Sequence, residues 1–572
     1  MSSFRVGSTT LDNGDPALMA KVEIVKVRAF WSPSRLALAM FLLAGSAVLL
    51  TLGDPGITTD EPLDVRPGRT YVETLRVRGL GFFERATVDR VFRDNAEHPP
   101  LGRWLLGLAS TLGQPFEIQL FGADPIGLYL RSGRLAPAFC FALLVGLITH
   151  TAARRHEIPA GAAAGFALLV MPRCFAHAHF GALDTFITLF WTGALLGSER
   201  ALTSKQPILA MFGAGALWSL ALLTKIHAWF LIPVVFIWCF VRLNGKLRAF
   251  AAFSVWLVTG LTLFVLGWPW LWFDSATRLR AYLGTGVERA SIRVLYFGEI
   301  FADKDVPWHY PWIYFALTVP VGLHILGAGG VVRAWRNRRD DPFSLLLLGS
   351  ILMFLSLFST RIPVYDGERL FLMVFPLWSI LIGREFRVLW TMCSGKTIVR
   401  VGLLIFMLVQ GYGVVTYHPF GLSYYNAFVG GLSGAESRGL ELTFWGDAVD
   451  RVLLDEVSKE VPGDAAIVLV PTLYPGQGIA STTPAMARKP VLLSDQENLS
   501  RARWVVVSRR SAYWPVDLQE RLQNGRLVYQ RVCRGVWLSA LYALDPSKAP
   551  PIRSSKSSSW NVQSPPSQSS DD

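Results

Sequence analysis

The chain has 572 residues, of which 52% are hydrophobic and 20 are tryptophan, and it carries a formal net charge of +13. This composition excludes a soluble protein of ordinary kind. The charge does not indicate a nucleic-acid partner, because the basic residues are dispersed among apolar segments, where anchoring at a membrane surface accounts for most of them. The five cysteines are scattered and odd in number, so we expect neither a disulfide framework nor a metal cluster.

Long apolar stretches recur along the first three quarters of the chain. A helix needs about 20 apolar residues to cross the ~30 Å hydrocarbon core of a bilayer, so the sequence predicts a polytopic α-helical membrane protein. One stretch contains Pro172, and we expect it to be kinked there. The eleven expected spans are residues 36–53, 133–152, 159–176, 181–198, 208–224, 227–241, 249–269, 311–332, 343–360, 370–386 and 398–417.

The distribution of Lys and Arg predicts the orientation of these spans, because short cytoplasmic loops are enriched in both. The N-terminal segment 1–35 and every second loop after it are basic, so we expect a cytoplasmic N-terminus in the inner or plasma membrane. Eleven crossings then place the C-terminal region outside. Loop 54–132 is also basic, but loops of this length cross largely regardless of charge. Loop 271–310 is basic and shorter, and it fits the topology less well.

The character of the chain changes after residue 417. Short strand-like segments alternate with helical or turn-like ones, which predicts a small extracytoplasmic α/β domain over residues 418–548. Residues 549–572 are rich in Ser and Pro, and we expect a disordered tail. The strand-like segments are 465–472, 489–495, 502–510 and 534–544.

Ionisable residues gather in the loops expected on the outer side. Charged groups near apolar segments are costly in a membrane, so we expect these residues to share a polar cavity. Simpler interpretations stay open. Asp60 and Glu61 could cap a helix, Asp184 and Lys225 could form a purely structural pair, and residues 361–369 could be a solvated loop. The candidates are Asp60, Glu61, Glu97, His98, Arg103, Asp184, Lys225, Arg361 and Arg369.

Two of these motifs resemble a known family. An Asp-Glu pair after the first span, here Asp60-Glu61, and an HPPLGK-like motif, here residues 98–103, are similar to the protein O-mannosyltransferases and their bacterial relatives, which include the lipid A aminoarabinose transferases. The family lysine is Arg103 here, and loop 271–310 is too short for the β-trefoil insertion of eukaryotic members. Softer similarity extends over residues 173–191, 221–233, 366–376 and 423–448.

The resemblance implies a C-type glycosyltransferase (GT-C) fold and a polyprenyl-phosphate sugar donor. We expect transfer of a sugar, with a hexose such as mannose as first choice, to an acceptor hydroxyl with inversion. Protein O-glycosylation is the first interpretation, transfer to a lipid or glycan the second, and a flippase for lipid-linked glycans the alternative from another class. We expect no carboxylic general acid, because the phosphate is already a competent leaving group, and no metal or other cofactor, because cationic side chains can hold the phosphate.

The same reasoning predicts the role of each residue. Asp60 is the expected general base, and Glu61 orients the acceptor or holds the loop. Cations must hold the phosphate as negative charge builds on it. The expected phosphate-binding residues are Arg103, His98, Lys225 and Arg369, and the expected supporting residues are Glu97, Asp184 and Arg361.

Overall fold

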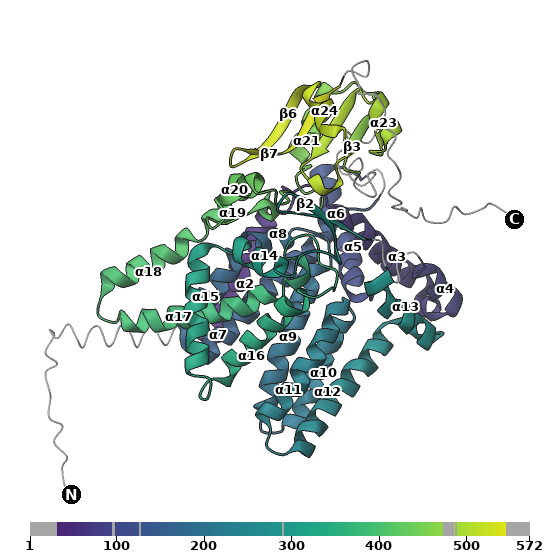
Figure 1. Ribbon diagram of the computed structural model, residues 1–572. Helices are drawn as coiled ribbons and strands as arrows, with labels where there is room; N and C mark the ends of the chain where they lie inside the picture. The colour runs from purple at the N-terminus through teal and green to yellow at the C-terminus, as the bar shows by residue number, and fades with distance from the viewer. Residues whose placement is uncertain are drawn as a thin grey trace, which may run out of the picture.

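A computed structural model describes residues 31–93, 98–124, 127–288, 291–472, 486 and 489–544. A body of helices carries a β-sheet domain, built from the C-terminal part of the chain, on one end (Figure 1). The helices α10, α11 and α12 extend toward the opposite end of the molecule (Figure 1).

Each expected span falls on a helix or on a pair of short helices. Within the described ranges, four stretches could cross a membrane by length and composition, and a fifth could if α14 and α15, which are bent by 116° to each other, form one span. The expected number of eleven stays a prediction. The helices are α2 (Pro33–Leu50), α7 (Leu135–Leu169), α9 (Asp184–Leu202), α10 (Pro207–Leu222), α11 (Leu231–Arg242), α12 (Lys246–Gly267), α14 (Tyr310–Thr318), α15 (Val321–Arg336), α16 (Pro342–Leu357), α17 (Val374–Met392), α18 (Thr397–Val409) and α19 (Tyr412–Tyr417).

Helix α7 comprises two helices joined by a sharp bend. The backbone leaves the helical region at His156 and at Glu157, whose φ is +73°. Gly161 then lies against the first half, where a Cβ on it would stand 2.5 Å from the Cβ of Ala153, so the second half runs back along the first. The break expected at Pro172 is confirmed, because α7 ends at Leu169 and Pro172 begins the short helix α8 (Pro172–His177).

The two long loops are folded. In the first, α3 packs on α5 at Gly68 and Gly107, where the backbones approach so closely that a Cβ on Gly107 would stand 2.0 Å from the carbonyl carbon of Gly68. The second contains a β-hairpin. The elements of the two loops are α3 (Asp60–Arg78), α4 (Arg85–Val91), α5 (Leu101–Phe121), α6 (Leu130–Gly133), α13 (Ser275–Glu288), β1 (Arg293–Tyr296) and β2 (Glu299–Ala302).

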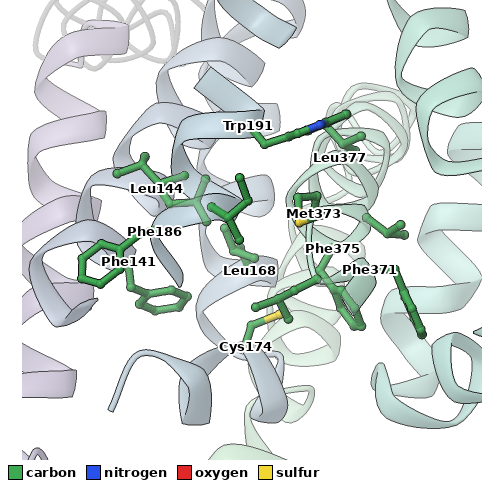
Figure 2. Packing of buried hydrophobic residues seen from close by; sticks show 14 of the residues in the cluster. Phe141, Leu144, Leu168, Cys174, Phe186, Trp191, Phe371, Met373, Phe375 and Leu377 are labelled. Atoms are coloured by element: carbon green, nitrogen blue, oxygen red, sulfur yellow. The ribbon is translucent and has the colours of Figure 1, made fainter. Parts of the chain in front are cut away.

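The largest hydrophobic core lies between α7, α9 and α17. Phe141 and Leu144 of α7 and Phe186 of α9 lie on one side of the view in Figure 2, and Phe375 of α17 lies across from them. Trp191 of α9 is fully buried and makes an edge contact with Phe354 of α16, with ring centroids 4.9 Å apart. This packing fixes the first residue of α9 relative to the loop that precedes α17.

The C-terminal domain is a five-stranded mixed sheet with strand order β4-β3-β5-β7-β6. Strand β3 is parallel to β4 and β5, and β7 is antiparallel to β5 and β6. Helix α21 packs on one face, and α23 and α24 on the other. The elements are α21 (Arg451–Glu460), β3 (Ile467–Val470), β4 (Val491–Leu492), α23 (Gln496–Arg501), β5 (Trp504–Ser508), α24 (Leu518–Gln523), β6 (Arg526–Cys533) and β7 (Val536–Ala543).

The segment before this sheet belongs to the helical body. Apolar residues between 418 and 448, such as Tyr425 and Leu442, are buried in the same cluster as the helices, so the sheet's own core begins later than residue 418, at Val449. The segment also holds the sheet in place. Glu441 accepts hydrogen bonds of 2.6 and 3.1 Å from the backbone N–H groups of Ser511 and Ala512, which follow β5.

Candidate active site

Two carboxylates and two cations, Asp60, Asp184, Arg369 and Lys225, meet at the end of the helical body that faces the sheet domain. Asp60 is the first residue of α3, and Asp184 is the first residue of α9. A helix N-terminus favours a carboxylate, since the helix dipole leaves partial positive charge there. Arg369 lies in a short 3-10 turn, residues Arg369–Phe371, just before α17, and Lys225 follows α10.

Arg369 is the centre of this charge network. Its Nη2 contacts the Asp60 carboxylate, its Nε lies 3.1 Å from Asp184 Oδ2, and its Nη1 lies 3.2 Å from Asp366 Oδ2. The guanidinium carbon also lies 4.0 Å from the ring centroid of Trp445, a cation–π contact. One arginine therefore joins three carboxylates from three separate elements.

Each inner carboxylate has a second cation. Lys225 Nζ donates to Asp184 Oδ1 over 2.6 Å, and both side chains are buried. Arg510 Nη2 lies 2.8 Å from Asp366 Oδ1. Burial by itself would raise the pKa of Asp366, but Arg510 and Arg369 outweigh it and hold that pKa below its ordinary value. Asp366 is therefore ionised, and the network alternates in sign.

Asp60 is the accessible member of the network. Its side chain is 25% exposed, whereas those of Asp184, Asp366, Arg369 and Lys225 are each exposed by 11% or less. Only one cation of the network, Arg369, contacts it among the described residues. A molecule arriving from outside would therefore reach this carboxylate first.

Glu61, the next residue, faces the opposite way and is fully buried. Its two carboxylate oxygens lie 2.6 and 2.8 Å from Nε and Nη2 of Arg134, in a bidentate pair. They also accept the backbone N–H groups of Thr58, at 2.8 Å, and Gly181, at 3.0 Å. Arg134 donates in addition to the carbonyls of Leu52, Pro55 and Gly56, so the pair ties the loop before α3 to the bundle.

Arg103 and His98 lie beside the network. Arg103 is fully buried, with Nε 2.9 Å from Asp64 Oδ1 and Nη1 3.4 Å from the His98 carbonyl. Burial raises the pKa of Asp64 to about 6, although Arg103 opposes this. Burial, together with the charges of Arg103, Lys225 and Arg369, lowers the pKa of His98 well below its ordinary value. The imidazole of His98 is therefore neutral at physiological pH.

Two further candidates do not join the network. Glu97 lies outside the described residues. Arg361 is exposed, and it forms no ion pair with any described carboxylate. Within the described ranges, no three His, Cys, Asp or Glu side chains are grouped so that they could hold a metal ion.

Some members of the site carried no clear signal in the sequence. Arg510 lies at the end of a strand in a separate domain, and Arg134 lies 73 residues from its partner Glu61. Asp366 lies in a loop that was recognised as polar, but without a role. Trp445 lies in the segment 423–448, and that family resemblance was the signal that pointed toward it.

Comparison with known proteins agrees with the class that the motifs indicate. Residues 97–273, which contain His98, Arg103, Asp184 and Lys225, match the profile of the family described as dolichyl-phosphate-mannose-protein mannosyltransferase. No curated protein matches the chain in sequence. Over residues 97–273 the chain is therefore similar to the family that its motif at residues 98–103 resembles.

Solved structures with partial similarity to this chain include ArnT and an archaeal oligosaccharyltransferase. ArnT from Cupriavidus metallidurans in the apo state is 16% identical with a TM-score of 0.48, and the match covers 94% of this chain and 100% of that one. ArnT bound to undecaprenyl phosphate is 17% identical, with the same TM-score and coverage. The apo oligosaccharyltransferase of Archaeoglobus fulgidus is 11% identical with a TM-score of 0.41, and the match covers 90% of this chain and 75% of that one.

Proposed function

We propose that this protein transfers one sugar from a polyprenyl-phosphate donor to an acceptor hydroxyl, with Asp60 as the general base. The observation that carries the proposal is the position of Asp60 as the accessible end of a buried charge network. The donor class follows from the description of the family whose profile matches. A hexose such as mannose is the first candidate for the sugar, and a protein hydroxyl is the first candidate for the acceptor.

In this proposal the acceptor hydroxyl attacks the anomeric carbon from the face opposite the phosphate. The bond from the acceptor oxygen to that carbon forms while the bond from the carbon to the phosphate oxygen breaks, so the anomeric configuration inverts. Asp60 takes the hydroxyl proton, and the phosphate leaves with the bonding electron pair. A positioned base typically accelerates such a step by about 10²–10⁴-fold.

Arg369 couples the two ends of the reaction. Before transfer, its Nη2 pairs with the ionised Asp60 carboxylate. The proton that Asp60 receives neutralises that carboxylate and weakens the pair. The positive charge of Arg369 then becomes available to the phosphate at the moment when negative charge builds on it. Asp184 and Asp366 hold Arg369 in place, and Lys225 is the second cation for the phosphate.

The remaining residues position this pair. Glu61 holds the start of α3 through Arg134, and is a positioning residue in the proposal. Arg103 holds α5 to Asp64 of α3, and the neutral His98 donates a hydrogen bond to the donor phosphate. We place the site on the extracytoplasmic side, because the helix ends far from Asp60 carry the basic loops typical of the cytoplasmic side.

The test is sugar transfer in membranes that contain the full-length protein and a polyprenyl-phosphate hexose labelled in the sugar. The wild type is compared with Asp60→Asn and with the control Asp54→Asn, which removes an exposed carboxylate from the same loop. We expect Asp60→Asn to lower the transfer rate by at least about 10²-fold and Asp54→Asn to leave it unchanged. Equal rates in the wild type and Asp60→Asn would refute the base assignment.

The location of the label identifies the acceptor. Label in protein supports O-glycosylation. Label in lipid or glycan would mean that the acceptor is a lipid or a glycan, and the proposed transfer reaction would stand. If the wild type moves labelled donor across the bilayer without breaking its sugar–phosphate bond, the protein is a flippase and the proposal fails.

A further inference from the structure

A cavity of about 630 Å³ lies at the other end of the helical body from Asp60. Its walls come from the first half of α7, from α9, from α10 and from Phe343 of α16. Helix α9 begins at Asp184 in the active site, and at 1.5 Å per residue Arg200 lies roughly 24 Å further along its axis. The cavity is therefore separate from the site described above. Its apolar walls are Leu147, Leu189, Phe190, Leu196, Leu217 and Leu220.

Gly193 of α9 leaves space for this cavity. Gly197 also lines it, but a Cβ on Gly197 would stand 2.8 Å from the Cδ1 of Leu217, so that position is already filled by a neighbour. A Cβ on Gly193 would meet only the Cδ2 of Leu147, at 4.0 Å, so the volume that a larger side chain would fill is open.

The mouth of the cavity is basic. Arg154 and Arg200 line it and are exposed, and neither forms an ion pair with a carboxylate among the described residues. The single acid in the lining, Glu199, is fully buried and is already paired with Arg155 at 3.0 Å and Arg242 at 3.3 Å. The charge of Glu199 is therefore compensated, and the two outer arginines give the mouth a net positive charge.

An apolar slot with a cationic mouth fits an amphiphile that has an anionic head. We propose that this cavity binds an anionic phospholipid from the membrane leaflet farther from Asp60, with one acyl chain along the walls and the phosphate between Arg154 and Arg200. A free phosphate would leave the apolar walls uncovered. A zwitterionic lipid would bring its own cation toward the arginines. Clusters of basic residues beside a membrane attract anionic lipids for the same reason.

The test uses the purified full-length protein in detergent micelles and counts bound lipids by native mass spectrometry. Phosphatidylglycerol is titrated in parallel with phosphatidylcholine of the same acyl chains, and glycerol 1-phosphate serves as the soluble anion. We expect one phosphatidylglycerol molecule to be retained at concentrations where phosphatidylcholine is lost. Glycerol 1-phosphate should not compete at the same concentrations.

Two variants test the two halves of the cavity separately. Arg154→Gln with Arg200→Gln removes the cationic mouth and should weaken phosphatidylglycerol binding by about fivefold per arginine. Gly193→Leu fills the slot, leaves every charge in place and should also release the lipid. The control, Arg336→Gln with Arg339→Gln, removes the same charge from exposed positions outside the lining and should leave binding unchanged.

Three outcomes would overturn the proposal. Equal retention of phosphatidylglycerol in all the variants would place the lipid elsewhere. Competition by glycerol 1-phosphate at equal concentration would make the occupant a soluble anion. Retention of phosphatidylcholine equal to that of phosphatidylglycerol would mean that Arg154 and Arg200 do not select the lipid by its charge. Circular dichroism of each variant separates a lost site from a lost fold, and none of these results depends on sugar transfer.

Discussion

Arg510, two residues after strand β5, lies with its Nη2 2.8 Å from Asp366 Oδ1 in the loop before α17. Asp366 in turn contacts Arg369, the arginine that pairs with Asp60. Burial opposes the charge of Arg510, yet Asp366 raises its pKa above the ordinary value, so the guanidinium stays charged. The sheet domain therefore supplies a cation to the charge network and does not merely rest on the helices.

We predict that Arg510→Gln lowers the rate of sugar transfer by roughly 10- to 100-fold, or about 1.4–2.7 kcal/mol of activation free energy. With Arg510 gone, Asp366 has only Arg369 as a charged partner and draws it away from Asp60. Initial rates in membranes measure the effect, and Arg509→Gln is the control, because its partner Glu436 lies outside the network. The double variant Asp366→Asn with Arg510→Gln is compared with each single variant. If its increase in activation free energy equals the sum of the two single increases, the two residues do not act as a pair.

The bidentate pair of Glu61 and Arg134 predicts a loss of stability. Glu61→Gln leaves the guanidinium of Arg134 buried without its carboxylate, and breaking a buried ion pair in this way typically costs about 3–5 kcal/mol. Thermal unfolding of the purified protein should therefore begin several degrees lower. Asp60→Asn, at a partly exposed position, should unfold close to the wild type. Glu84→Gln, an exposed change in the same loop, is the control, and an equal Tm for Glu61→Gln would contradict the assignment.

The sequence was informative where the signal is local. Hydrophobic length predicted the helices, and the polar loops predicted that Asp60, Asp184, Lys225 and Arg369 lie at one end of the bundle, where the structure brings them into one network. The possible pairing of Asp184 with Lys225 is confirmed at 2.6 Å. Each of these inferences needs only the residue and the apolar segment beside it.

The parts that the sequence missed depend on distant contacts. Arg510 is 144 residues from Asp366, and nothing in either segment marks the other as its partner. The expected span 133–152 contains Arg134, which lies between α6 and the first residue of α7. Strand β6 was not predicted, because this edge strand, RLVYQRVC, lacks the regular alternation of buried and exposed residues that marks a half-buried strand.

Asp447 predicts a pH dependence of stability. Its carboxylate is fully buried and forms no ion pair within 4.0 Å with a cation among the described residues, and the backbone N–H of Ala448 and the charge of Arg173 only partly offset the burial. Burial raises its pKa to about 7, from 3.8. As the pH rises from about 4 to about 7, the unfolded chain gives up this proton and the folded protein keeps it, so the free energy of unfolding falls through that window and is flat above it.

Asp447→Asn should remove this contribution. We expect the pH slope of stability between about 4 and 7 to become shallower by up to one proton, and the Tm at pH 8 to rise. Thermal unfolding at a series of pH values measures both. Glu441, whose pKa burial also raises to about 7, and Asp64, whose pKa burial raises to about 6, keep their own share of the slope. The exposed change Asp455→Asn is the control, and an unchanged slope in Asp447→Asn would mean that Asp447 is already ionised in the fold.

The contact of Gly68 with Gly107 predicts how the position of Asp60 depends on helix packing. A Cβ on Gly107 would stand 2.0 Å from the Gly68 carbonyl carbon, and backbone cannot move aside as a side-chain end can. Gly107→Ala must therefore push α5 away from α3, the helix that Asp60 begins. Overpacking of this kind typically costs about 1–3 kcal/mol.

We expect Gly107→Ala to lower both the Tm and the transfer rate, because it disturbs the network through α3. Gly53→Ala is the matched control, since a Cβ there meets nothing within 4 Å. Unfolding curves and initial rates on the same preparations separate the two effects. A variant that loses stability but keeps the full rate would show that the catalytic carboxylate is held by its ion pair with Arg369 and not by the packing of α3 on α5.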